Sequence, residues 1–102
     1  MSVSSSARKL PNINTACFSV TADTDPGTFP RVIELFAKRG LTPLKCHSSQ
    51  THMNANMEID TQQVIDIQMA GMDQALANKI GASLRQTYGV FSVLLSTKTN
   101  AF

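Results

Sequence analysis

The chain has 102 residues, of which 42% are hydrophobic and 16% charged, and its net charge is +2. This length fits one domain with a single core and is too short for a catalytic domain joined to a regulatory one. So small a net charge gives no reason to expect nucleic acid or an anionic membrane as a partner.

The domain is predicted to span residues 13–97. Residues 1–12 are rich in serine, with two basic residues and a proline, and bury little apolar surface. We therefore expect a flexible N-terminal tail at residues 1–12 and a short C-terminal tail at residues 98–102.

The first strand is predicted over residues 13–22, because apolar and polar residues alternate from Ala16 onward. Phe18 and Val20 should face the core. A turn follows at Asp25-Pro26-Gly27, which combines a side-chain acceptor, a fixed φ angle and a permissive backbone.

A helix that stops at Gly40 is predicted after this turn. Thr28 or Asp25 can cap its first amides, and Pro30 falls in the first helical turn, where a missing N–H does no harm. Gly40 suits the position just after the helix. The apolar residues that recur at helical spacing are Phe29, Val32, Ile33, Phe36 and Ala37.

A second strand is predicted over residues 41–49, with Pro43 near its start or at a sheet edge. The segment 50–63 fits two alternatives. It forms either strand extensions around a turn at residues 54–56 or an irregular loop.

The second half of the chain repeats the pattern of the first. A strand is predicted over residues 64–71, a helix over about 72–88 and a fourth strand over residues 90–96. Gly81 is a mild weakness inside this helix. The helical stripe consists of Leu76, Ala77, Ile80, Leu84 and Tyr88.

The order β-α-β-β-α-β predicts an α+β fold of the ferredoxin-like type, with a four-stranded antiparallel sheet and two helices on one face. The uncovered face and the edge strands can meet another subunit, so we expect a homodimer.

Cys17 and Cys46 each lie in an apolar, strand-like run without metal-ligand spacing, which predicts buried free thiols. In the predicted sheet, the third strand separates them too widely for a disulfide. Free thiols fit a reducing cytoplasm. The chain has neither an apolar run of the roughly 20 residues that span a bilayer nor a secretory signal at its start, so we expect a soluble, cytoplasmic protein with no membrane association.

The sequence lacks the residues that several functions of this fold require. The strand at 64–71 has no aromatic residue for stacking RNA bases, and the first loop has no cysteine for a soft metal. Asp23 and Asp25 make that loop a poor phosphate cradle. His47 and His52 have no third ligand nearby, so they are expected to be solvated and to bind no metal. We find no catalytic constellation and expect neither an enzyme nor a cofactor.

The segment DPGTFPRVIELFAKRGL at residues 25–41 resembles the signature of ACT domains, and the resemblance extends over about Ile13 to Ser96. Within that family, RVIELFAKRG is most similar to the small regulatory subunits of acetolactate synthase, in particular their short single-domain variant. The resemblance implies a subunit that binds and activates a large catalytic subunit in branched-chain amino-acid biosynthesis. That large subunit depends on thiamine diphosphate.

The resemblance also implies a small-molecule site at the turn, against a neighbouring subunit. Amides at a helix N-terminus can receive a carboxylate such as that of an amino-acid effector. Many amino-acid sensors of the family have asparagine where this chain has Thr24 and Thr42. Two alternatives remain: a tight turn without a ligand, and a free-standing sensor of an amino acid or similar metabolite. The implied ligand-binding residues are Thr24, Asp25, Pro26, Gly27, Thr28 and Thr42.

Overall fold

A computed structural model describes residues 13–53 and 59–100, so the tail expected at residues 1–12 lies outside the described part. The elements follow the predicted order. They are β1 (Ile13–Ala22), α2 (Thr28–Ala37), β2 (Lys45–Met53), β3 (Ile59–Ala70), α3 (Gln74–Arg85) and β4 (Val90–Asn100).

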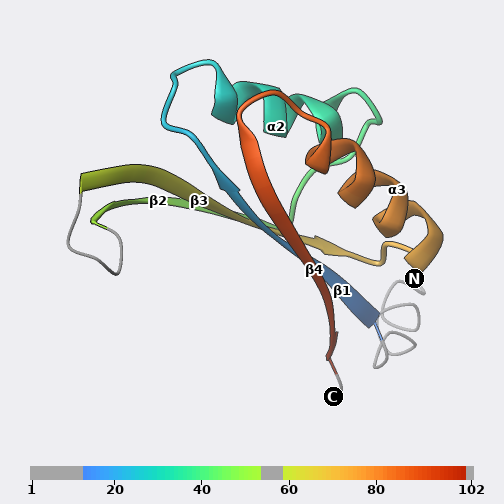
Figure 1. Cartoon of the computed structure of the whole chain (residues 1–102). Helices are drawn as coiled ribbons and strands as arrows, with labels where there is room; N and C mark the ends of the chain where they lie inside the picture. Colours follow the sequence, from blue (N-terminus) through green and yellow to red (C-terminus); the bar gives the residue numbers. More distant parts are fainter. Residues whose placement is uncertain (1–12, 54–58, 101–102) are drawn as a thin grey trace, which may run out of the picture.

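The four strands form one antiparallel sheet in the order β2-β3-β1-β4. Both helices lie over the same face of this sheet (Figure 1). The predicted ferredoxin-like α+β fold is therefore confirmed. Strands β2 and β4 are the edges, and a register shift between Thr21 and Ala22 marks an irregularity in the β1–β4 pairing.

The core lies between the sheet and the helices. Alternate residues of β1 pair with alternate residues of β3, so that Phe18 lies beside Ile67 and Val20 beside Ile65, all four buried. Phe36 of α2 meets Phe18 edge to face, with ring centroids 5.5 Å apart. The other buried apolar residues are Ala16, Ala22, Val32, Met69, Ala77, Ile80, Leu84 and Val93.

Helix α2 ends as predicted at a glycine with positive φ. Gly40 has φ +69°, its N–H donates to the carbonyl of Ala37, and the N–H of Leu41 donates to that of Phe36. This pair of bonds is a Schellman closure, which a residue with a Cβ adopts only with strain.

The bounds of strands β2, β3 and β4 differ from the predicted ranges. Strand β2 begins at Lys45 and continues to Met53, and β3 begins at Ile59, as in the alternative of strand extensions. The turn considered at residues 54–56 lies outside the described part. Strand β4 continues to Asn100, so residues 98–100 belong to the sheet rather than to a tail. The extension arises because β1 starts at Ile13 and its first residues pair with the end of β4.

Tyr88 was wrongly assigned to the buried stripe of the second helix. Helix α3 stops at Arg85, and Tyr88 follows it with 81% of its surface exposed. The N–H of Thr87 donates to the carbonyl of Leu84, and the N–H of Val90 donates to that of Thr87, so the chain turns away from the helix axis before Tyr88.

Both cysteines are free, but the expectation that they are buried was wrong. Cys46 is exposed and Cys17 is half-buried. Cys46 is the second residue of β2, an edge strand whose residues from Lys45 to His52 are all exposed. Cys17 lies across from Gln68 and Cys46 across from Ile67, which places the two thiols on opposite faces with β3 between them.

Replacing Gly81 with alanine is expected to stabilise the fold by about 0.5–1 kcal/mol, because glycine weakens a helix interior relative to alanine. A Cβ at this position would lie 3.6 Å from Arg85 and 3.7 Å from Leu95, which is ordinary contact. Chemical denaturation of both forms measures the change. A loss of stability would show that α3 and β4 pack too tightly here for a methyl group.

Candidate functional site

The turn between β1 and α2 is fixed by distant parts of the chain. The N–H of Asp23 donates to the carbonyl of Gly89 at 2.8 Å, and the side-chain amide of Gln63 donates to the carbonyl of Asp23 at 2.7 Å. Gln63 is 6% exposed and also accepts a bond from the hydroxyl of Ser48. Strand β3 and the loop before β4 therefore set the position of the turn.

Two carboxylates of the chain accept hydrogen bonds from backbone amides of the turn. The N–H of Asp25 donates to Oδ1 of Asp23 at 3.2 Å, and the N–H of Gly27 donates to Oδ2 of Asp25 at 3.0 Å. The N–H of Thr28 donates to the carbonyl of Asp25 at 3.0 Å. The expected capping of helix amides by the side chain of Thr28 or Asp25 was therefore wrong: the Asp25 carboxylate bonds Gly27, the residue before the helix, and the first helical amide is bonded by a backbone carbonyl.

Thr28 instead joins the turn to the loop before β4. Its side chain is buried, and its hydroxyl donates to Oδ1 of Asp23. Gly89 lies directly against this pair, because a Cβ there would fall 2.7 Å from Oγ1 of Thr28. Its φ of +93° is also unfavourable for other residues.

Arg31 links the first turns of α2 to the same loop. Its Nη1 donates to the carbonyl of Tyr88 at 3.1 Å and to the hydroxyl of Thr28 at 3.4 Å. The guanidinium also lies 5.4 Å from the centre of the Tyr88 ring, within cation–π range. Arg31 and exposed Tyr88 form the outer rim of the turn.

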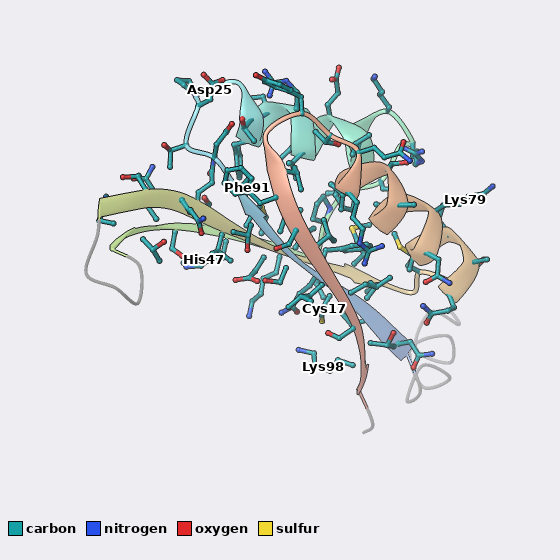
Figure 2. All side chains as sticks on the ribbon, in the orientation of Figure 1. Cys17, Asp25, His47, Lys79, Phe91 and Lys98 are labelled. Carbon is teal, nitrogen blue, oxygen red and sulfur yellow. The ribbon has the colours of Figure 1, made fainter. Side chains whose placement is uncertain are left out.

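Five of the six residues implied by the resemblance lie together in this turn. Asp25 and Pro26 are exposed at its tip, Thr24 and Gly27 are half-buried, and Thr28 is buried. Figure 2 shows Asp25 at the outer end of the loop, on the helix side of the sheet.

The sixth residue, Thr42, is separated from the turn. It is exposed in the loop after α2. The ten residues of α2 extend about 15 Å along the helix axis. Within one chain, the turn and Thr42 therefore lie near opposite ends of α2.

Sequence reasoning missed the roles of Gln63, Tyr88 and Gly89 at this turn. Gln63 had a signal, because it continues the core-facing alternation of β3 one step before Ile65 and a polar residue there needs a partner. Gly89 is a glycine between a helix and a strand. Nothing local in the sequence shows that it contacts Thr28.

A second candidate site is a trough of about 810 Å³ on the sheet face opposite the helices. Two rows of cross-strand neighbours build it. One row consists of Lys45, Gln68, Cys17 and Ser96. The other row consists of His47, Asp66, Ser19 and Leu94. Figure 2 shows His47 and Cys17 on this side of the sheet.

Comparison with known proteins gives no match to any family model or to any curated protein searched. Neither helix in the described part of the chain has the length and apolar character of a membrane span. Within residues 13–53 and 59–100, no three His, Cys, Asp or Glu residues are grouped so that they could hold a metal ion.

The thiol of Cys46 is expected to react slowly with iodoacetamide although the residue is exposed. Partial burial of the thiol, and secondly the nearby charge of Asp66, raise the pKa of Cys46 above its ordinary value. Since the thiolate is the reactive form, alkylation at pH 8 should be slower than for a cysteine in an unfolded peptide. Asp66→Asn should accelerate it by less than about threefold, because burial is the larger cause.

The raised pKa of Cys46 also determines in which direction the stability of the fold changes with pH. Because the folded pKa of Cys46 is raised, its contribution to stability is present below the pKa of an unfolded thiol. That contribution is lost as the pH rises through the folded pKa. Denaturation of the native chain and of Cys46→Ser at pH 7 and pH 10 tests it, and a native chain that gains stability relative to the variant at pH 10 would contradict the sign.

Proposed function

We propose that this chain is a non-catalytic, homodimeric regulatory subunit of the ACT type. It binds and activates an acetolactate-synthase-type enzyme of branched-chain amino-acid biosynthesis in the cytoplasm. The segment 25–41 supports this proposal, because its residues occupy the turn, the helix and the glycine closure in the order that the resemblance implies.

The observation that carries this proposal over that of a free-standing sensor is the internal bonding of the turn. An amino-acid effector would place its carboxylate on amides at the start of the helix. Here the carboxylates of Asp23 and Asp25 already accept bonds from amides of the turn. A ligand that used the amides of Asp25 or Gly27 would have to displace these carboxylates, and the amide of Thr28 is already bonded to the carbonyl of Asp25. A protein partner can contact the exposed tip as it stands.

The mechanism of activation would be differential binding. A subunit that binds the active conformation of the large chain more tightly than the inactive one shifts the balance toward activity. Edge strands β2 and β4 offer unpaired backbone groups through which two copies of the chain can pair side by side.

The first test is purification of the tagged protein from its own cells at low salt, with mass analysis of what accompanies it. We expect a large thiamine-diphosphate-dependent acetolactate synthase in stoichiometric amount. Recovery of a homodimer alone, under conditions that preserve such complexes, would count against the proposal.

A panel of amino acids tested by thermal denaturation examines the sensor alternative. A ligand present at 100 times its dissociation constant stabilises its protein by about 2.7 kcal/mol. We expect no amino acid to reach this effect on the isolated chain. A large shift with one amino acid would favour the sensor function.

A further inference from the structure

Strands β2 and β3 continue as a two-stranded ribbon past the end of β1. Strand β1 pairs with β3 only as far as Gln63, whereas residues 51–53 of β2 and 59–62 of β3 pair with each other beyond that point. Figure 1 shows this end of the two strands extending away from the rest of the sheet. Two strands without a third are only marginally stable in water, so the pairing in this ribbon is the part of the sheet that depends least on the core.

Gln63 lies at the base of this ribbon and connects it to the turn between β1 and α2. Its side chain is 6% exposed, and both polar atoms of its amide are bonded. The oxygen accepts from the hydroxyl of Ser48 on β2 at 3.3 Å, and the nitrogen donates to the carbonyl of Asp23 at 2.7 Å. Because a buried amide is costly to leave unpaired, a movement of β2 relative to β3 affects the bond to Asp23 as well.

The hydrogen bonds continue from the turn to its outer rim. Oδ1 of Asp23 accepts from the buried hydroxyl of Thr28, whose oxygen accepts from Nη1 of Arg31 at 3.4 Å. The same Nη1 donates to the carbonyl of Tyr88 at 3.1 Å, and Tyr88 is 81% exposed. One hydrogen-bonded network therefore joins edge strand β2 to the rim, and it consists of Ser48, Gln63, Asp23, Thr28, Arg31 and Tyr88.

We propose that this network couples the ribbon to the rim, so that loosening or ordering the ribbon changes the turn and the surroundings of Tyr88. Gln63 is the positioning residue of this coupling, because it belongs to β3 and holds the first residue of the turn. The coupling is reciprocal, so a molecule bound at the rim also changes the ribbon. It is a property of the isolated chain and goes beyond the proposed function.

The separation of the two ends excludes direct contact as the cause of such a coupling. Ser48 lies on β2 and Tyr88 in the loop before β4, and these edge strands are three strand spacings apart, which is about 14 Å. Substitutions that far apart normally act independently unless they share partners. A response of Tyr88 to a change at Ser48 would therefore indicate transmission through the network.

The test is nuclear magnetic resonance of the full-length, ¹⁵N-labelled chain, in which Tyr88 is the only tyrosine. Ser48→Ala removes the hydroxyl that donates to Gln63. Hydrogen exchange at the amides of Asp23 and Gly27 should then accelerate by about fivefold, the factor expected for the net loss of one hydrogen bond. The ring resonances of Tyr88 should also move. Ring resonances that stay in place in Ser48→Ala would overturn the inference.

Two further serine variants are the matched controls. Ser48→Thr keeps the hydroxyl and suits a strand, so it should restore the native exchange rates and the native resonances of Tyr88. Ser49→Ala makes the same change one residue further along, where the side chain lies on the opposite face beside Val64. It should leave exchange at Gly27 within about twofold of the native rate, as for other surface substitutions. Equal effects of Ser48→Ala and Ser49→Ala would contradict a role of the network.

Thr51→Gly changes the ribbon itself, because glycine weakens a strand. It should accelerate exchange at Gly27 and move the ring resonances of Tyr88. Thr97→Gly is the same change at an exposed position of the other edge strand, β4, and controls for a general loss of stability. It should leave Gly27 and Tyr88 as they are in the native chain. Native exchange at Gly27 in Thr51→Gly would overturn the inference.

These measurements need no large subunit, so their failure is distinct from failure of the proposed function. If the native chain does not bind the large subunit, the proposed function fails and a measured coupling stands. If the coupling is absent, the proposed function is unaffected. One consequence alone rests on the proposed function: two copies that pair along β2 would order the ribbon and, through the network, the tip that the large subunit contacts.

Discussion

Replacing Gly89 with alanine is expected to destabilise the fold by about 3 kcal/mol. The φ angle of +93° costs a residue with a Cβ about 1–3 kcal/mol in backbone strain. The added methyl group would also lie 2.7 Å from Oγ1 of Thr28 and 3.0 Å from Oδ2 of Asp23. Relieving that contact breaks the bond from Thr28 to Asp23 and leaves the buried hydroxyl of Thr28 without an acceptor, at a cost of about 1–3 kcal/mol.

Gly71→Ala is the matched control for Gly89→Ala. Gly71 has a similar positive φ of +71°, but a Cβ there would meet nothing within 4 Å. Only the backbone cost of about 1–2 kcal/mol is therefore expected. Urea denaturation of both variants separates the two contributions, and equal losses would mean that the contact of Gly89 with Thr28 does not hold the turn.

Replacing Phe36 with alanine is expected to cost about 3–5 kcal/mol, as other large-to-small changes of buried aromatic residues do. Phe36 is fully buried near the C-terminal end of α2 and packs edge to face on Phe18 of the sheet. Domains of this size have a total stability of about 5–15 kcal/mol, so the variant should be close to unfolding at 37 °C. Urea denaturation at 15 °C keeps enough folded protein to measure the loss.

The control for Phe36→Ala is Phe91→Ala on β4, where 60% of the side chain is exposed. Its expected cost is below about 1 kcal/mol, because little of the ring is withdrawn from water. A cost below about 1 kcal/mol for Phe36→Ala itself would mean that α2 does not cover the sheet as described.

The order of elements could be predicted because each signal is local. Alternation from Ala16 onward gives β1, the glycine after α2 ends that helix, and the alternation around Ile65 and Ile67 gives β3. The sheet topology then follows from the handedness of the connections.

The extent of the edge strands could not be predicted, because it depends on partners far along the chain. Strand β2 has only exposed residues between Lys45 and His52, so it carries no clear alternation of buried and exposed positions. It exists because β3 supplies a pairing partner. The exposure of Cys46 could not be predicted either, because apolar neighbours in the sequence do not show whether a helix covers that part of an edge strand.

The candidate site likewise contains residues that the sequence could place and residues that it could not. The five residues at positions 24–28 are contiguous, so the sequence alone could place them in one turn. Gln63 and Gly89 reach that turn from β3 and from the loop before β4, and no short spacing marks them. The bonds made by the two aspartates appear only in three dimensions, and these bonds weigh against an effector carboxylate.

The most direct test of the central claim is acetolactate formation by the purified large subunit as this chain is added. We expect activity to rise and to saturate at one copy of the chain per large subunit. The rise would follow from tighter binding to the active conformation. Activity that does not rise above that of the large subunit alone would contradict the proposed role as an activating subunit, whether or not the two chains bind stoichiometrically.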